Sequence, residues 1–337
     1  MLQVVLSYEF IGVKIFGIVS DAGGRNTKMF KLLQGHHEIK GPWPSAECLS
    51  FANPVDLNRS IYIWSCGTHN FKALRNNIWK SQLSKSKSFL KCGTPFGWNE
   101  IECTYLRDKG RIEKGLPQRT DLTKHSVYLD NFTKMNVSYV KKCFSEKTIS
   151  EMLAYVGDEL DVKFDIGKKF GSQWHKFMSY CVDLKSKISS NTTLQCKGYI
   201  AMLEYQIAVH GIYIERFINK EWQLNRDNID SEKEVLTHAI RYFTEWKAQR
   251  GHVISSMNLT KRDTEKYFMA DITYHNLLQC IGGFFAYSKA VLSASDPTSL
   301  WYVPGLHSNQ SSLENFFSRM RQLDEDRTDV YAGGVLQ

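Results

Sequence analysis

Two acidic residues stand where a carboxylate could bind a metal ion or take part in catalysis. Asp21 directly follows a β-branched and aromatic run, residues 13–20, which predicts a buried strand. A carboxylate at the end of such a strand is well placed to be a metal ligand, and Gly23 and Gly24 would let a phosphate backbone approach. A solvated turn in which Asp21 caps the next helix explains the same residues equally well.

The second acidic residue is Glu314, in the first turn of a predicted amphipathic helix. Apolar residues recur from Leu313 at i, i+3, i+4 and i+7 and give that helix one apolar stripe. Ser311 and Glu314 also form a capping box, and on physical grounds alone the cap is the better interpretation of Glu314. If the fold collected Asp21 and Glu314 in one cleft, two carboxylates joined by Mg²⁺ would suit phosphodiester chemistry.

A candidate phosphate-binding segment lies between these two residues. Residues 61–64 predict a second short strand, which leads through a glycine turn into a helix expected to begin at His69. His69, Lys72 and Asn76 are spaced i, i+3 and i+7, so they share one face of that helix. Free N–H groups at a helix start attract anions, and the basic side chains beside them would favour phosphate. The sequence does not contain a P-loop.

The stretch around this helix contains no acidic residue from Leu57 to Asn99. Its basic residues up to position 91 are Arg59, Lys72, Arg75, Lys80, Lys85, Lys87 and Lys91. A solvated face normally mixes both signs of charge. Residues 59–91 therefore support two interpretations equally, a surface for DNA backbone or nucleotide phosphate and an ordinary solvated face.

Composition limits the class of protein. The 337 residues are enough for about two domains, and 42% hydrophobic residues indicate a globular protein. The net charge of +8 favours a polyanionic partner. Eight cysteines form no C-x-x-C pair, which argues against a zinc ribbon and indicates reduced thiols in an intracellular protein. The longest apolar run, around residues 281–287, is too short to span a bilayer, so we expect a soluble protein without a membrane partner.

Beyond the two strands the sequence is mostly helical. Residues 35–60 predict a loop, and residues 92–131 predict an irregular region with one short helix near 98–105. Longer helices are predicted at residues 132–144, 146–159, 173–188, 198–218, 232–249 and 266–292. In the helix at 232–249, the apolar stripe contains Leu236, Ile240, Phe243 and Trp246, and Gly251 is the expected stop signal.

Several segments together resemble the P-element-type transposases, the family that includes the THAP-domain transposase-like proteins. Asp21 and Asn26 after a strand are similar to one catalytic segment of that family. Residues 66–76, from Cys66 to Asn76, resemble its Asp-x-Pro-His-x-x-Lys-x-x-Arg-Asn segment. Residues 122–125 with 134–137 resemble a third block, and residues 309–317 resemble Asn-Gln-Asp-x-Leu-Glu-Asn-Phe-Phe. The order and spacing agree from about residue 10 to 321.

The resemblance implies an RNase H-like core that cuts and joins DNA with an Asp-Asp-Glu triad and Mg²⁺, in the nucleus. It also implies a helical GTP-binding domain inserted before the last acid. Asp21 would be the second Asp and Glu314 the Glu, and both would bind the metal. The expected nucleotide-binding residues are His69, Lys72, Asn76, Lys87 and Ser311.

The fold class expected from the resemblance is an α/β, incomplete RNase H-like core interrupted by a large, mostly α-helical insertion domain. Residues 1–65 would form the partial RNase H-like domain, with later strands only. Residues 66–305 would form the helical GTP-binding-like insertion. Residues 306–337 would return to the core with the Glu314 helix.

Departures from the family pattern lower the expected activity. The sequence has no counterpart of the family's first catalytic Asp or of the three strands around it. It also has no counterpart of the zinc-coordinating THAP module. Cys66 and Ser311 replace two acids that contact the nucleotide in the family, and a thiol cannot supply a bidentate acceptor. The leading hypothesis is a degenerate or truncated transposase, domesticated or fragmentary, that cleaves no DNA alone. The alternative is a non-catalytic DNA- or nucleotide-binding module that self-associates as a homo-oligomer.

Overall fold

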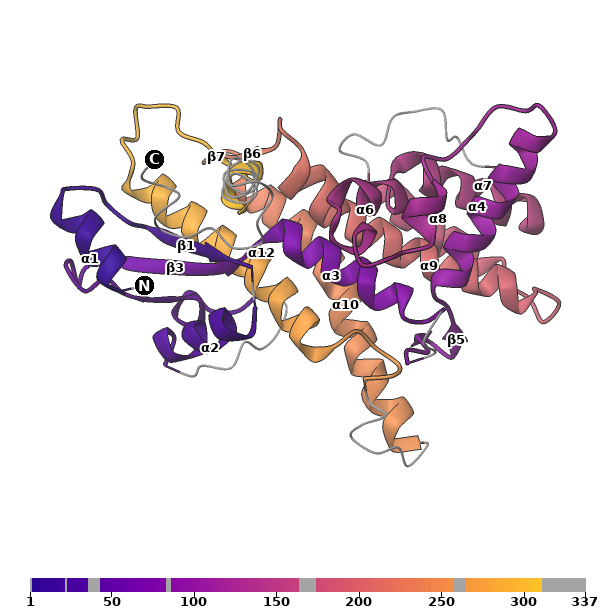
Figure 1. Ribbon diagram of the computed structural model, residues 1–337, viewed down its shortest axis with the longest axis horizontal. Coiled ribbons are helices and arrows are strands. Elements are labelled where there is room, and N and C mark those ends of the chain that lie inside the picture. Colours follow the sequence, from indigo (N-terminus) through magenta and orange to yellow (C-terminus); the bar gives the residue numbers. More distant parts are fainter. Residues whose placement is uncertain are drawn as a thin grey trace.

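A three-stranded sheet lies at one end of an elongated molecule, and helices make up most of the rest (Figure 1). This computed structural model describes residues 2–21, 23–35, 43–82, 86–163, 174–256 and 265–310, without the side chains of 174–178 and 252–256. The mostly helical composition with small sheets is compatible with the predicted helical insertion domain.

Strand β3 (Ser60–Ser65) is the centre of the sheet. It pairs in parallel with β1 (Gly17–Ser20) and antiparallel with β2 (Ser50–Ala52), so that the order is β1-β3-β2. Alternate residues of β3, Ile61 and Ile63, are fully buried, as expected for the apolar side of a strand. Ser20 of β1 lies opposite Ser65 of β3, which aligns the ends of the two parallel strands.

The first strand is shorter than the predicted 13–20, because side chains take the backbone groups of its first half. The Ile15 N–H donates to Glu9 Oε1 at 2.6 Å, and the Ile15 carbonyl accepts from Arg59 at 2.7 Å. The ladder to β3 therefore begins only with Phe16, whose carbonyl accepts from the Tyr62 N–H at 2.9 Å. Glu9 belongs to helix α1 (Leu2–Phe10), so these bonds also attach that helix to the sheet.

The prediction of a loop over residues 35–60 was wrong in part. Within the described residues of this stretch, a 3-10 turn η1 (Ala46–Leu49) leads into β2. β2 contains no β-branched residue, so the strand arises from its pairing with β3 and not from local propensity. Helix α2 (Gly24–Leu33) precedes the loop and buries Phe30.

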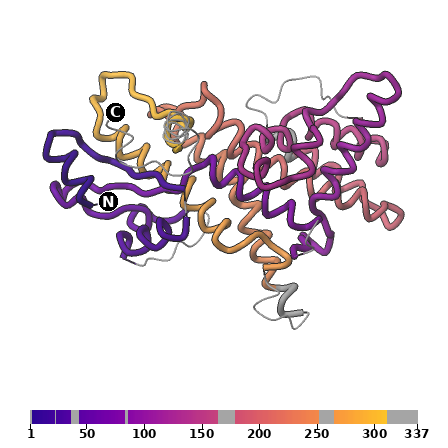
Figure 2. The backbone as a smooth tube through the Cα atoms, viewed as in Figure 1, coloured from indigo at the N-terminus to yellow at the C-terminus, as the bar shows by residue number. Residues whose placement is uncertain are grey.

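Helices α3 (Gly67–Trp79) and α12 (Asp271–Ala294) connect the sheet with the helical part. α3 begins at Gly67, two residues before the predicted start, and an added Cβ there would lie 2.9 Å from the Phe217 ring. α12 packs along β3, where Gly283 comes so close that a Cβ would lie 2.3 Å from the Ile63 carbonyl oxygen. The chain thus leaves the sheet through α3 and returns along it through α12 (Figure 2).

Helix α12 corrects one expectation about apolar length. By length and composition alone it could cross a membrane, and it is the one such helix in the part of the chain that the structure describes. Most of that apolar window is buried inside the protein, against β3, α3 and α10. Its apolar character is therefore explained by packing in the core.

The helical part contains the remaining elements. They are β4 (Leu90–Lys91), β5 (Thr94–Pro95), α4 (Trp98–Glu113), α5 (Lys124–Val127), η2 (Thr133–Met135), α6 (Val137–Cys143), α7 (Glu146–Leu160), α8 (Trp174–Ser186), α9 (Leu194–Val209), η3 (His210–Ile218), β6 (Gln223–Leu224), α10 (Ile229–Ser256), β7 (Val303–Pro304) and η4 (Leu306–Ser308). α4 is longer than predicted, residues 132–144 divide into η2 and α6, and residues 198–218 divide into α9 and the π-helix η3.

One connected cluster of buried apolar side chains joins the sheet to the helices, from Trp64 of β3 through Phe71 of α3 to α9 and α10. The predicted stripe of α10, represented by Leu236 and Trp246, is buried in it. Gly251 does not end α10, which continues to Ser256. A glycine inside a helix costs only about 1 kcal/mol relative to alanine, which neighbouring residues can offset.

Candidate site at the ends of the parallel strands

Three segments that are far apart in the sequence meet where β1 and β3 end. Asp21 follows β1, Cys66 follows β3, and the parallel register places these ends side by side. The backbone N–H of Gln310 lies 3.4 Å from Cys66 Sγ, and its side-chain amide lies 3.5 Å from the Val19 carbonyl oxygen. The end of a parallel sheet is where α/β proteins commonly place their functional groups.

Asp21 is exposed and its carboxylate is held by local hydrogen bonds. Oδ1 accepts from the Gly23 N–H at 2.9 Å and from Asn26 Nδ2 at 2.6 Å. The bond from Gly23 is the main cause of a lowered pKa for Asp21, and His69 adds to it electrostatically. Asp21 therefore stays ionised, and its bond from Gly23 tightens the turn before α2. The N-cap of α2 is Gly23 with no side-chain cap bond, so the predicted capping role of Asp21 was wrong, while its role as a metal ligand stays a prediction.

The first turns of α3 place His69 and Lys72 beside this strand end. His69 is half-buried, close enough to influence the Asp21 carboxylate. Lys72 is only 6% exposed, and no described residue accepts a hydrogen bond from its ammonium. Asn76, one turn further, donates to the Lys134 carbonyl at 3.4 Å, and its Oδ1 is buried without a hydrogen bond. An anionic ligand would give the Lys72 ammonium the partner that the described residues do not supply.

Lys87 has a different environment. Its ammonium donates to the backbone carbonyls of Glu265 and, at 3.1 Å, Phe268. Burial lowers its pKa. The segment that holds Lys87 continues to Ala270, whose N–H donates to Asn77 near the C-terminal end of α3 at 3.0 Å. Lys87 therefore has its partners within the protein, and it does not lie with His69 and Lys72 in the first half of α3.

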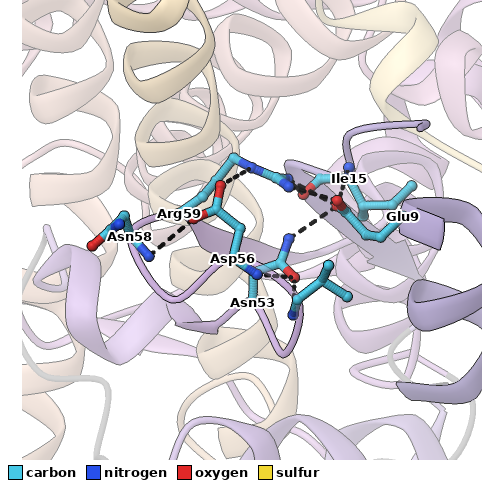
Figure 3. Close-up of polar contacts among 7 residues, drawn as sticks. Glu9, Ile15, Asn53, Asp56, Asn58 and Arg59 are labelled. Atoms are coloured by element: carbon cyan, nitrogen blue, oxygen red, sulfur yellow. Dashed lines mark hydrogen bonds and ion pairs between the residues drawn. The ribbon is translucent and has the colours of Figure 1, made fainter.

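The basic window is not one exposed surface. Arg59 pairs with Glu9 (Figure 3), and Lys91 is buried, with its ammonium 3.3 Å from Glu204 and 3.5 Å from the centre of the Tyr242 ring. Arg75 is fully buried and donates to the Thr133 and Lys134 carbonyls at 3.1 and 2.9 Å. Within the described part of the window, Lys80 is the exposed cation among those named from the sequence. The partners of these cations are carboxylates and carbonyls outside residues 59–91, so their charges are balanced although the window itself contains no acidic residue.

Three of the predicted residues, Glu314, Ser311 and Lys85, lie outside the described residues. The chain reaches the strand ends immediately before Ser311, through Gln310. Ser308 fixes this approach, because its carbonyl accepts from the buried Trp64 Nε1 at 2.8 Å.

Sequence reasoning missed the cations of α2. Arg25, Lys28 and Lys31 are exposed and recur every three residues along the helix that starts just after Asp21. The spacing of these three cations was visible in the sequence, but only the longer acid-free window was interpreted as a DNA or phosphate surface. Gln310 was recognised only as part of a motif and not as a contact to the strand ends.

The residues at the strand ends supply few of the ligands that the implied magnesium site needs. Mg²⁺ is usually held by one or two carboxylates with water or substrate oxygens. At the strand ends Asp21 offers one carboxylate, and one of its oxygens already accepts two hydrogen bonds. Over the described ranges, no group of three His, Cys, Asp or Glu side chains could hold a metal ion. The described residues therefore do not fit a complete metal site.

A cleft of about 910 Å³ lies away from the strand ends, between α6, the start of α7 and η3. Burial lowers the pKa of its His210 to about 4, and burial raises the pKa of Glu215 to about 6. Arg216 bridges Glu215 and Glu232 at 3.1 and 2.9 Å. None of the residues predicted from the sequence line this cleft.

Comparison with known proteins gives one informative likeness. No protein-family model matches the sequence, and no curated protein matches it. Among solved structures, the chain is similar to the Drosophila P element transposase strand transfer complex, with a TM-score of 0.54 and 15% identity. The likeness covers 95% of this chain and 58% of the transposase chain. At this identity the likeness shows a shared fold, and the chain spans little more than half the length of that neighbour.

Proposed function

We propose that the chain is a transposase-derived protein that binds DNA through the sheet end and does not cleave it alone. The observation that carries this proposal is the structural likeness to the P element transposase complex over 95% of the chain. The motifs around Asp21, Cys66 and Gln310 support it, because the fold brings these three separate segments to one place.

In this proposal the sheet is the remaining part of an RNase H-like core, and Asp21 and Glu314 descend from its catalytic acids. Mg²⁺, where bound by two such acids, would assist cleavage of a phosphodiester by stabilising its charged oxygens. Cys66, at the position of a family acid, accepts a hydrogen bond from Gln310 instead of offering a carboxylate. The role of this chain's own residues is therefore to bind DNA, in the nucleus, rather than to cut it.

DNA backbone would be bound by the exposed cations of α2. Arg25 and Lys28 are exposed on the helix that begins three residues after Asp21. Phosphate contacts of this kind depend on salt and little on sequence.

The test is fluorescence anisotropy with duplex DNA over a range of salt concentrations. Arg25→Glu with Lys28→Glu should weaken binding at least about tenfold and reduce the salt dependence. The matched control is Lys114→Glu with Lys124→Glu, two exposed lysines of the helical part. Equal loss in both pairs, or binding that salt does not change, would contradict the proposal.

A second candidate function is binding of a nucleotide, GTP by resemblance, at the start of α3. Lys72 favours it, because this largely buried residue has no acceptor for its ammonium among the described residues. His69 and Asn76 share its helix face, with Ser311 following Gln310 in the chain, whereas Lys87 is already bound by carbonyls.

Calorimetry with GTP and ATP tests this candidate. Lys72→Met should abolish nucleotide binding, while Lys80→Met, a change of an exposed lysine on the same segment, should leave it unchanged. Equal weak affinity for GTP and ATP would remove guanine recognition from the proposal, and no binding of either would remove the nucleotide altogether.

A further inference from the structure

The cleft between α6, the start of α7 and η3 has a rigid floor of hydrogen-bonded side chains. The Arg216 guanidinium donates to Glu232 Oε2 at 2.9 Å and to Glu215 Oε2 at 3.1 Å. Glu232 Oε2 also accepts from Trp222 Nε1 at 3.1 Å, so one oxygen fixes both the guanidinium and the indole ring. An added Cβ at Gly305 would lie 2.5 Å from that ring, which shows how closely the backbone supports it. The floor is therefore formed before any ligand binds.

The floor carries more negative than positive charge. Two carboxylates, Glu215 and Glu232, face the single guanidinium of Arg216, and a pKa of about 6 leaves Glu215 mostly ionised at neutral pH. The imidazole of His210 adds no positive charge, because burial lowers its pKa to about 4. Glu232 Oε1 accepts no hydrogen bond from a described residue, and this side chain is 23% exposed. An ammonium in the cleft could donate to this oxygen beside the Trp222 ring, whose face also attracts cations.

Two lysines of the same cleft have the opposite need. Lys141 of α6 and Lys220, which follows η3, are exposed and form no ion pair with the described residues. Partial burial and the positive charge of Lys220 lower the pKa of Lys141, so the two ammonium groups lie close enough to repel one another. A third lysine, Lys147, differs from them because Asp121 pairs with it at 3.0 Å. A carboxylate between Lys141 and Lys220 would relieve their repulsion.

The charges of the whole cleft select the kind of ligand. Among the described residues, five carboxylates and four cations line it, so the sum is close to zero. A polyanion such as a nucleotide would meet Glu146 and Glu221 as well as the floor, whereas a ligand with only an ammonium would meet Lys141 and Lys220. A small molecule with one ammonium and one carboxylate offers each part of the cleft its opposite charge.

The cleft also has an apolar wall and enough room for such a molecule. Ile214 and Ile218 of η3 are half-buried and line it together with Trp222. Its volume of about 910 Å³ falls in the range of sites that bind small molecules. η3 is a π-helix, a conformation that occurs frequently at functional sites.

We propose that this cleft binds a small zwitterion of the amino-acid class with an apolar frame. Its carboxylate lies between Lys141 and Lys220, and its ammonium donates to Glu232 Oε1 beside Trp222. This inference goes beyond the proposed DNA function, since it uses none of the residues at the strand ends.

Calorimetry of the purified full chain with two probes tests it. L-leucine carries both charged groups on one carbon, and 6-aminohexanoate carries them at opposite ends of an apolar chain. At least one probe should bind with a dissociation constant below about 1 mM. The halves of each probe should bind at least about tenfold more weakly: 4-methylpentanoate and 3-methylbutylamine for leucine, hexanoate and hexylamine for 6-aminohexanoate. Binding of neither probe, or a half that binds as tightly as its zwitterion, overturns the proposal.

Substitutions assign the binding to the cleft. Lys141→Met with Lys220→Met should weaken binding of the zwitterion at least about tenfold, and both side chains are exposed, so the fold should be kept. Glu232→Gln should weaken it similarly, because the amide oxygen can still accept from Arg216 and Trp222 while the charge is lost. Circular dichroism checks both variants, and the lysine pair alone decides if Glu232→Gln does not fold.

The matched control is Lys114→Met with Lys187→Met, two exposed lysines that do not line the cleft. This control should bind the probe like the wild type. An unchanged dissociation constant in the Lys141 and Lys220 variant, or an equal loss in the control, overturns the assignment to this cleft.

Discussion

The two halves of α3 and the residues around them show opposite uses of positive charge. Beyond the first half of α3, Arg75, Lys87 and Lys91 are all buried, and each donates to carbonyls or a carboxylate, Arg75 through its Nη2 alone. In the first half, Lys72 is equally buried but binds no described acceptor. All four come from one stretch without acidic residues.

This difference separates structural cations from a candidate ligand-binding cation. Desolvating a charge is costly, so a buried cation normally has its partner inside the protein. Lys87 and Lys91 follow this rule with partners from other segments, whereas Arg75 follows it only in part, because its Nε and Nη1 are buried without a hydrogen bond. Lys72 has no acceptor for its ammonium among the described residues beside the strand ends, which is the physical reason for placing the ligand there.

The largest expected effect follows from breaking a pair in the C-terminal group. Lys91→Met should lower the free energy of unfolding by about 3 kcal/mol, because Glu204 would keep only the half-exposed Lys185 as its partner. Urea unfolding measures this, with Lys80→Met as the exposed control, expected within about 0.5 kcal/mol of wild type. If the two variants lost the same stability, the buried pair would have no structural role.

A smaller effect should appear at Arg59, the member of the window that lies at the sheet. Its hydrogen bonds lower the pKa of Glu9 from 4.5 to about 2. A lowered carboxyl pKa stabilises the fold above the unfolded value, and that stability is lost as the pH falls from about 4.5 through 2. Glu9→Gln should therefore remove about 2 kcal/mol at neutral pH and flatten the acid limb of the stability profile. An unchanged acid limb in thermal melts would contradict this account.

The smallest effect on stability is expected at Lys72. Lys72→Met should leave the free energy of unfolding within about 0.5 kcal/mol of wild type, because the ammonium has no acceptor among the described residues to lose. Phosphate or nucleotide binding should be lost at the same time. A destabilisation as large as that of Lys91→Met would show that Lys72 has a structural partner and would end the contrast between the two halves.

Much of the fold followed from local patterns. The β-branched runs indicated β1 and β3, and the stripe through Leu236 and Trp246 indicated the buried face of α10. β2 could not be predicted, because its three residues become a strand only by pairing with β3. The length of β1 depended on Glu9 and Arg59, which are distant in sequence from each other.

The candidate site was predictable in part for a similar reason. Asp21, His69 and Lys72 stand at ends of elements, which local patterns reveal. That the basic window turns inward depends on Glu204, Glu265 and Phe268, whose positions only the tertiary structure gives. The division into residues 1–65, 66–305 and 306–337, and the roles of Glu314 and Ser311, stay predictions.

Nicking of supercoiled plasmid by the purified chain with Mg²⁺ or Mn²⁺ tests the central claim most directly. We predict DNA binding without nicking, and the same result for Asp21→Ala and Glu314→Ala. Metal-dependent nicking by the wild type that either substitution abolishes would contradict the account, because it would show a complete catalytic site.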